Sequence, residues 1–175
     1  MVEPFIFQIV GYQNSGKTTF INHLITKLKL LGIRTATIKH HGHGGKPEIV
    51  EKKDSSSHIT AGALASLVEG EGRLLLQIEN CETDLADQIQ LISMIKPNLI
   101  LIEGHKHEPY PKAVFIRNQK DTELLKKLKG IELVLYQDEF PETDMVCFQR
   151  DDSKAIQWLI DYLRQQIQWK KADPQ

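Results

Sequence analysis

The chain has only two cysteines, Cys81 and Cys147, among its 175 residues. Their spacing fits neither a metal site nor a disulfide framework, so we expect two reduced thiols. The 22 basic residues nearly balance the 23 acidic ones, whereas proteins that bind nucleic acid or acidic membranes broadly have a basic excess. No apolar run approaches the ~18 residues of a membrane span, and a signal-peptide pattern is missing. The sequence therefore predicts a soluble, cytoplasmic protein with neither nucleic acid nor membrane as partner.

What the sequence does contain is a glycine-rich motif. Residues 11–19 read Gly-Tyr-Gln-Asn-Ser-Gly-Lys-Thr-Thr and match G-x-x-x-x-G-K-[ST] in full. In this motif backbone N–H groups and a helix N-terminus hold a nucleotide's β-phosphate. Lys17 would reach the β- and γ-phosphates, Thr18 would hold Mg²⁺, and Thr19 would lie nearer the α-phosphate. The alternative is a helix-capping glycine loop with a solvated lysine. The expected nucleotide-binding residues here are Gly11, Asn14, Ser15, Gly16, Lys17, Thr18 and Thr19.

The segments around this motif alternate between strand and helix patterns, which predicts an α/β fold of the P-loop NTPase type with a mostly parallel sheet. A chain of 175 residues suits one domain, so we expect a single nucleotide-binding domain over residues 1–175. Its last few residues are candidates for disorder. Residues 63–68 and 73–78 flank a glycine-containing turn and predict a small hairpin insertion. Further strands are expected at 5–10, 33–38, 99–102, 113–116, 133–136 and 145–148, and helices at 20–31, 85–95, 122–129 and 156–167.

Residues 39–58 are polar and histidine-rich, and we expect a long loop there because little in the stretch can pack. Its lysine and histidines, which are Lys39, His40, His41, His43 and His58, allow three interpretations: contact with nucleotide or partner, a transition-metal site, or a solvated loop. The spacing of these histidines matches no standard set of metal ligands, so the metal interpretation is not favoured over the others. Asp54 is a candidate second Mg²⁺ ligand, and a plain helix N-cap is the alternative.

Two acidic positions follow predicted strands, at the sheet edge where nucleotide sites of this architecture lie. Glu103 comes directly after the apolar run 99–102, where a P-loop protein places the acid that binds Mg²⁺ or the catalytic water. A strand-end surface charge is the alternative. Asn118 and Asp121 fit the loose form [NT]-[KQ]-x-D with which many GTPases recognise guanine, although a turn with an N-cap competes. Asp138, after the next strand, is the rival guanine reader.

With these residues placed, the chain resembles the MobB family of molybdopterin-guanine dinucleotide biosynthesis proteins. The selective features are Lys39-His40 with His43, then Asp54-Ser55-x-x-His58 followed by Ala61-Gly62-Ala63, and Glu103-Gly104-x-Lys106 leading to Pro111-Lys112. The family usually has a basic residue where Ser57 stands and an aromatic residue where His105 stands.

The resemblance implies a homodimeric, Mg²⁺-dependent GTP-binding protein that assists a separate guanylyltransferase and hydrolyses GTP slowly at most. Lys17 and Glu103 are then the catalytic candidates, Thr18, Glu103 and Asp54 the metal candidates, and Lys39 and Lys106 contacts of phosphate or of the pterin partner. Two alternatives stay open. A small-molecule kinase would need arginines around the transferred phosphoryl group, which the sequence near the motif does not offer. A metallochaperone GTPase would use the histidines.

Overall fold

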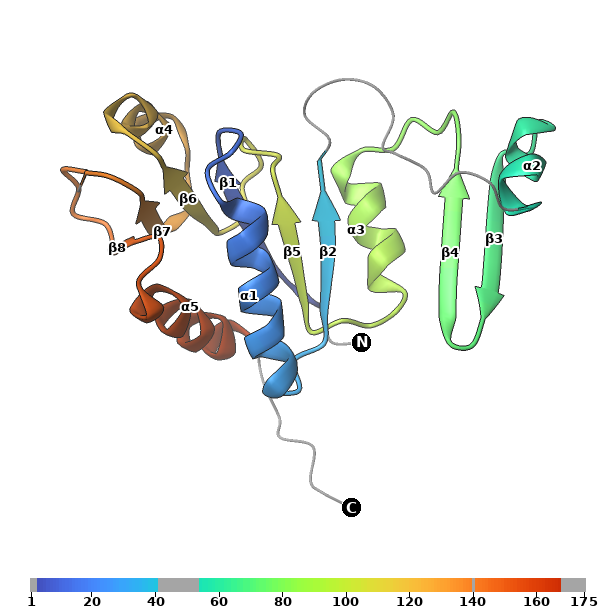
Figure 1. Ribbon diagram of the computed structural model, residues 1–175, viewed down its shortest axis with the longest axis horizontal. Coiled ribbons are helices and arrows are strands. Elements are labelled where there is room, and N and C mark those ends of the chain that lie inside the picture. The colour runs from blue at the N-terminus through green and yellow to red at the C-terminus, as the bar shows by residue number, and fades with distance from the viewer. Residues whose placement is uncertain (1–2, 41–53, 140, 168–175) are drawn as a thin grey trace, which may run out of the picture.

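The computed structural model describes residues 3–40, 54–139 and 141–167, and it is an α/β structure with one larger and one smaller sheet (Figure 1). The expected histidine sites His41 and His43, and the candidate C-terminal disorder, lie outside the described residues. Strands are β1 (Phe5–Gly11), β2 (Thr35–Lys39), β3 (Ala65–Gly70), β4 (Arg73–Ile78), β5 (Leu99–Glu103), β6 (Lys112–Ile116), β7 (Ile131–Tyr136) and β8 (Cys147–Gln149). Helices are α1 (Lys17–Leu30), α2 (Asp54–Thr60), α3 (Leu85–Ser93), the 3-10 helix η1 (Gln119–Thr122), α4 (Glu123–Lys127) and α5 (Ser153–Gln166).

The larger sheet has six strands in the order β2-β5-β1-β6-β7-β8, and all of its pairs are parallel. Strand β1 lies between β5 and β6, so the loop that follows Gly11 leaves the middle of the sheet. In Figure 1 the arrowheads of β2 and β5 point to the upper edge, where this loop also lies. Because the carboxyl ends of parallel strands meet at one edge, the fold gathers the loops after β1, β2, β5 and β6 there.

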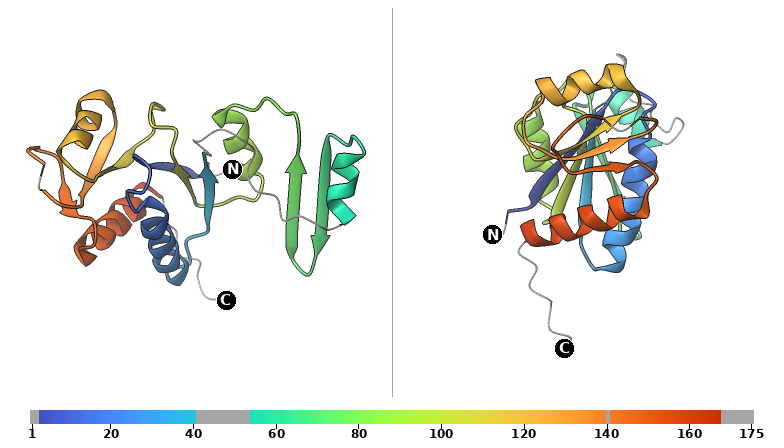
Figure 2. Two further views of the ribbon diagram at one scale, coloured as in Figure 1. Left: turned by 45° about the horizontal axis from the view of Figure 1, so that its top comes forward. Right: turned by 90° about the vertical axis from the view of Figure 1, so that its left-hand side faces the viewer.

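Helices cover both faces of this sheet, which explains why its inner strands are mostly apolar (Figure 2). Alternate residues of β1 face opposite ways: Phe7 and Ile9 belong to the core formed with α1 and α5, whereas Val10 packs with residues of α4. Ile100 and Ile102 of β5 form a third cluster with Leu85 of α3. The predicted P-loop NTPase-like layering is therefore confirmed.

The smaller sheet is the hairpin of β3 and β4, which lies to the side of the larger sheet in Figure 1. Its turn uses Glu71 and Gly72, whose φ angles of 48° and 76° are both positive. Two positive φ angles in a two-residue loop suit the right-handed twist of a hairpin. Helix α2 packs against β3. The predicted hairpin insertion is thus confirmed.

The structure corrects the expected loop over 39–58 at its end, since residues 54–58 belong to helix α2. A short helix of serine, aspartate and histidine has no apolar period, so its sequence resembles a loop. Strand β2 begins at Thr35 and not at residue 33, because the Ile33 amide donates to Leu28 O at the end of α1. The helix expected at 122–129 is the shorter α4, and the 3-10 helix η1 precedes it.

Candidate functional site

The loop between β1 and α1 has a conformation that only glycine allows at its two ends. Gly11 has φ 153°, and a Cβ there would lie 2.8 Å from Phe115 Cβ. Gly16 has φ 88°, and a Cβ there would lie 3.0 Å from Arg150 Cδ. Between them Asn14 has φ 57°, in the left-handed region that asparagine tolerates better than most residues. The backbone conformation of the loop therefore requires glycine at these two positions, as the sequence pattern predicts.

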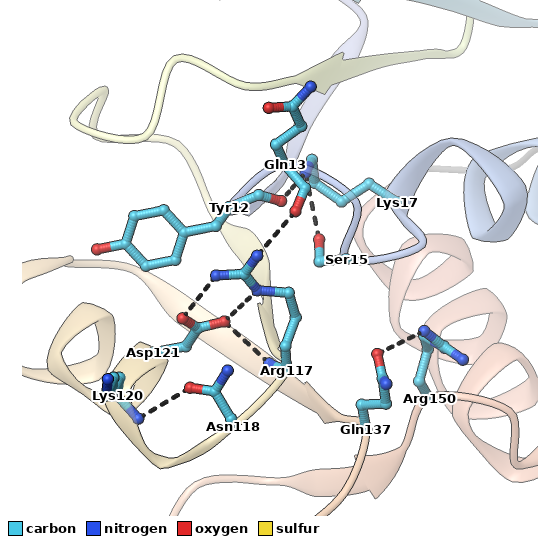
Figure 3. A network of polar contacts seen from close by, with 10 residues as sticks. All are labelled: Tyr12, Gln13, Ser15, Lys17, Arg117, Asn118, Lys120, Asp121, Gln137 and Arg150. Carbon is cyan, nitrogen blue, oxygen red and sulfur yellow. Dashed lines mark hydrogen bonds and ion pairs between the residues drawn. The ribbon is translucent and has the colours of Figure 1, made fainter.

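Donors gather at the start of α1. The backbone amides of residues 16–19 donate to no acceptor in the described part of the chain, as expected for the first turn of a helix. Lys17 Nζ donates to Tyr12 O at 2.6 Å and to Ser15 Oγ at 3.2 Å (Figure 3). Burial lowers the pKa of Lys17. Free amides, a helix N-terminus and a partly desolvated ammonium group together form a site for an anion.

A second group of polar side chains joins α1, β2 and β5. Thr18 Oγ1 donates to both carboxylate oxygens of Glu103, at 2.9 and 3.2 Å. Lys39 lies opposite Glu103 in the sheet register, and its Nζ is 3.4 Å from Glu103 Oε2 and 3.3 Å from Thr18 Oγ1. Glu103 is only 14% exposed. A hydroxyl and a carboxylate at this spot are the oxygen donors that Mg²⁺ takes, so these residues fit the predicted metal role.

The segment after β5 brings further charge to the same place. Lys106 Nζ is 4.6 Å from the ring centroid of Tyr12, a cation–π distance. The imidazoles of His40 and His105 have centroids 4.6 Å apart, and burial, with a smaller contribution from His40, lowers the pKa of His105. Thus loops after β1, β2 and β5, distant in sequence, meet at one edge of the sheet.

The structure also brings two arginines to the phosphate loop that sequence reasoning missed. Arg117 Nη1 donates to Gln13 O at 3.1 Å, and its Cζ lies 5.3 Å from the Tyr12 ring centroid (Figure 3). Arg150 packs beside Gly16 and donates to the Gln137 side chain. The sequence argument against a kinase relied on a lack of arginines near the motif. This argument is wrong, because the fold brings Arg117 and Arg150 close to the phosphate loop. Neither arginine is near the motif in sequence, so only the strand order reveals them.

The predicted base-reading residues have other partners in the structure. Asp121 is buried, and its carboxylate accepts from Arg117 Nε at 2.7 Å, Nη2 at 3.1 Å and the backbone amide at 3.0 Å. Asn118 Oδ1 accepts from the Lys120 amide and caps η1. The turn and N-cap, weighed as the alternative, are what the structure forms. Asp138, the rival reader, is exposed after β7.

The phosphate loop, Lys39, Glu103 and the start of the segment after β5 surround a pocket of about 930 Å³, at the upper end of the range for small-molecule sites. The charged side chains lining it are Lys17, Lys39, Lys106 and Arg117 against Glu103, so its walls favour an anion. Asp54 begins helix α2. Asn118 and Asp121, whose side chains the structure describes, are not among the residues that line the pocket. The predicted site residues that do line it are Gly11, Asn14, Ser15, Gly16, Lys17, Thr18, Thr19, Lys39, Glu103 and Lys106.

Two other features are absent from the described residues. Histidine, cysteine and acidic side chains do not gather in threes or more around any point that could hold a metal ion. Within the same residues, every helix is too short or too polar to cross a membrane.

Comparison with known proteins identifies the family of the chain. The family model described as "Molybdopterin guanine dinucleotide synthesis protein B" matches residues 6–136. A Bacillus subtilis protein named probable molybdopterin-guanine dinucleotide biosynthesis adapter protein is 38% identical over 168 residues, which are 94% of this chain and 96% of that protein. The crystal structure of Bacillus subtilis MobB is 34% identical, with a TM-score of 0.78 over 91% of this chain and 98% of that one. A MobB homologue from Bacillus stearothermophilus is 30% identical, with a TM-score of 0.75 over 91% and 98%. The chain therefore belongs to the MobB family.

Proposed function

We propose that the chain binds GTP with Mg²⁺ in this pocket, as a single P-loop domain that acts in molybdenum cofactor biosynthesis. Its role there is that of an accessory protein to the guanylyltransferase that forms molybdopterin guanine dinucleotide. The names of its relatives, which call them adapter proteins of this biosynthesis, support the pathway. The observation that carries nucleotide binding is the phosphate loop, which has glycines with positive φ at both ends, amides open at the helix start, and Lys17 beside them.

Each residue's role follows from its position. Lys17 neutralises charge on the β- and γ-phosphates, and Thr18 with Glu103 supplies oxygen ligands to Mg²⁺ or its water. Lys39 and Lys106 line the same pocket and contact phosphate oxygens of the nucleotide or of the pterin. Hydrolysis is slow at most, so the proposed role is to present nucleotide and not to consume it.

Guanine recognition is best assigned to Asp138. Asp121 would have to release the Arg117 guanidinium before accepting from a base, and Asp121 is buried. Asp138 is exposed and follows β7, the parallel neighbour of β6, so it lies at the same edge of the sheet as the phosphate loop, although the pocket lining includes neither Asp138 nor Asp121. Asp138→Asn should shift preference from guanine toward xanthine nucleotide, whereas Asp121→Asn should not. The reverse pattern would return the role to Asp121.

Isothermal titration with GTP, ATP and Mg²⁺ tests nucleotide binding. Lys17→Ala removes the ammonium group from the phosphates, and hydrogen bonds to charged groups contribute about 1.5–3 kcal/mol each. We therefore expect GTP affinity to fall on the order of 100-fold with the fold intact. Lys120→Ala, which removes an exposed lysine after β6, is the matched control and should bind GTP normally. Full affinity in Lys17→Ala would contradict the proposal.

We further propose that the hairpin is the homodimer interface. Leu67, Leu74, Leu76 and Ile78 share one face of it and are 58%, 56%, 42% and 39% exposed. So many apolar side chains on a sheet of two strands mark an interaction surface, since two isolated strands are barely stable in water. A second copy of the chain would bring an identical apolar face, and a two-fold axis makes such a face self-complementary.

Light scattering coupled to size-exclusion chromatography tests the interface. Leu67 and Leu76 are cross-strand neighbours, so the pair Leu67→Asp and Leu76→Asp places two charges in the centre of that face. We expect this variant to be monomeric while the unmodified chain is a dimer. Leu30→Asp is the control, because Leu30 is 80% exposed at the end of α1, outside the hairpin. A dimer that survives the paired change, or a monomeric unmodified chain, would contradict the assignment.

A further inference from the structure

Two polar side chains lie fully buried beneath the pocket, in the middle of the larger sheet. Gln8 of β1 and Lys112 of β6 are both 0% exposed, and they are neighbours in the strand register. Burying an amide or an ammonium group costs free energy unless hydrogen bonds replace the lost water. Lys112 forms no ion pair with a carboxylate among the described residues, and Gln8 Oε1 has no hydrogen-bond partner there. Apolar residues would pack here at a lower free-energy cost. The presence of Gln8 and Lys112 at these positions therefore requires an explanation.

Both side chains hold the backbone of the same segment, residues 104–111. Gln8 Nε2 donates to Gly104 O at 3.2 Å and to His105 O at 2.7 Å. Lys112 Nζ donates to Glu108 O at 2.7 Å and, on its other side, to Lys129 O at 2.8 Å. The segment between β5 and β6 is therefore fixed at its start by one side chain and at its middle by the other.

The held backbone is strained at its start. His105 has φ 51°, in the left-handed region that disfavours side chains, and Gly104 before it has φ 102°. A Cβ on Gly104 would lie 3.0 Å from the His40 Cβ. Such a conformation persists only where surrounding contacts determine it, and it is typical of functional sites. The two carbonyls that Gln8 binds belong to Gly104 and His105, the two residues with positive φ.

Lys106 directly follows Gly104 and His105, and it is a residue of this segment that lines the pocket. Its Nζ stands over the Tyr12 ring of the phosphate loop, and it has no carboxylate partner in the described part of the chain. A cation without a counter-ion at a fixed place is prepared for an incoming anion, because its ordering is complete before binding.

We propose that Gln8 and Lys112 are positioning residues that hold segment 104–111 so that Lys106 meets a phosphate group of the bound nucleotide. This inference rests on the proposed GTP binding and adds residues to it that touch no ligand. On this proposal the buried amide of Gln8 and the buried ammonium group of Lys112 serve nucleotide binding and not the stability of the core.

Gln8→Met is the sharpest variant, because methionine fills the same volume and also removes the acceptor that has no partner. Its unfolding temperature should stay near that of the unmodified chain, while GTP affinity falls on the order of 10-fold as Lys106 loses its place. Lys106→Ala should lose about 10-fold to 100-fold. In Lys106→Ala background, Gln8→Met should cause no further loss, since its effect passes through Lys106. Gln149→Met, an exposed change, is the control.

Hydrogen exchange gives a second readout that needs no ligand. Amides of 104–108 should exchange faster in Gln8→Met and in Lys112→Met, but not in Lys106→Ala or in the exposed-lysine control Lys126→Met. If Gln8→Met folds poorly, Lys112→Met takes its place in the comparison of GTP affinity with Lys106→Ala and the double variant.

The outcomes separate the two proposals. GTP binding with additive losses in the Gln8 and Lys106 double variant, or unchanged exchange and affinity in Gln8→Met, would overturn the positioning role alone. An unmodified chain that binds neither GTP nor inorganic tripolyphosphate would overturn the proposed function and this inference with it.

Discussion

The pair formed by Arg117 and Asp121 allows a prediction with a definite magnitude. Asp121 has a side chain 3% exposed and accepts three hydrogen bonds, all from Arg117. Arg117→Ala keeps the backbone amide bond but removes the two from the guanidinium, which leaves a buried carboxylate short of partners. Breaking a fully buried pair costs about 3–5 kcal/mol. Because the Arg117 side chain is 34% exposed, solvent screens the pair and we expect a loss of about 2–3 kcal/mol.

Urea unfolding at neutral pH measures this loss for Arg117→Ala, Asp121→Ala and the double variant. A loss of that size corresponds to a fall in unfolding temperature of about 5–10 °C for a chain of this length. Asp121→Ala should cost less, since the freed guanidinium can reach water. The double variant should then be more stable than Arg117→Ala alone, because no unpaired carboxylate remains. Additive losses, or a loss below about 1 kcal/mol for Arg117→Ala, would refute the reasoning.

The pH dependence of the same variants checks the cause. Hydrogen bonds from Arg117 lower the pKa of Asp121, so the pair's stabilisation is present above the ordinary value of 3.8 and is lost as pH falls below it. In Arg117→Ala burial should instead raise that pKa. The stability difference between the two proteins should therefore shrink on acidification, and a difference that grows there would contradict this explanation.

Two further predictions concern groups at or near the site. Burial and His40 lower the pKa of His105 below its ordinary 6.5, so the unfolded chain binds more protons below that pH and stability should fall as pH drops from about 6.5. His105→Phe should reduce this slope in unfolding measured from pH 5 to 8, and an unchanged slope would exclude His105 as its source. Burial raises the pKa of Cys147 to about 11, whereas Cys81 is exposed. Iodoacetamide at pH 8 should therefore modify Cys81 well before Cys147, as mass spectrometry of the peptides would show; equal rates would contradict this.

The sequence predicted those parts of the site that are local in the chain. The phosphate loop, its flanking strand and helix, and Glu103 at the end of an apolar strand all depend on residues within a few positions of one another. The contacts of Arg117 with Gln13, and of Gln8 with Gly104, join residues about a hundred positions apart. They exist because β1 lies between β5 and β6, and strand order is not encoded in any short pattern.

Asp121 shows why a short motif leaves two interpretations open without that order. The pattern around it fits a guanine-reading motif, and the same pattern fits a capped turn whose aspartate accepts from a nearby arginine. The geometry of the two is related, since guanine and guanidinium both present adjacent N–H donors to a carboxylate. What the sequence does not contain is which residues after β6 line the pocket: Arg117 does and Asp121 does not, and this depends on the neighbouring strands.

On the proposed function, Lys39 would couple the binding of magnesium to the binding of nucleotide. Its ammonium group contacts Glu103 and Thr18, the two residues that fit a magnesium ion. An ammonium group and a divalent cation attached to the same oxygens repel each other strongly at such distances. Magnesium binding would therefore displace the Lys39 ammonium, and because Lys39 lines the pocket, phosphates bound there would accept its hydrogen bonds. Magnesium and nucleotide would then bind with positive cooperativity, because each removes a charge conflict that the other would meet alone.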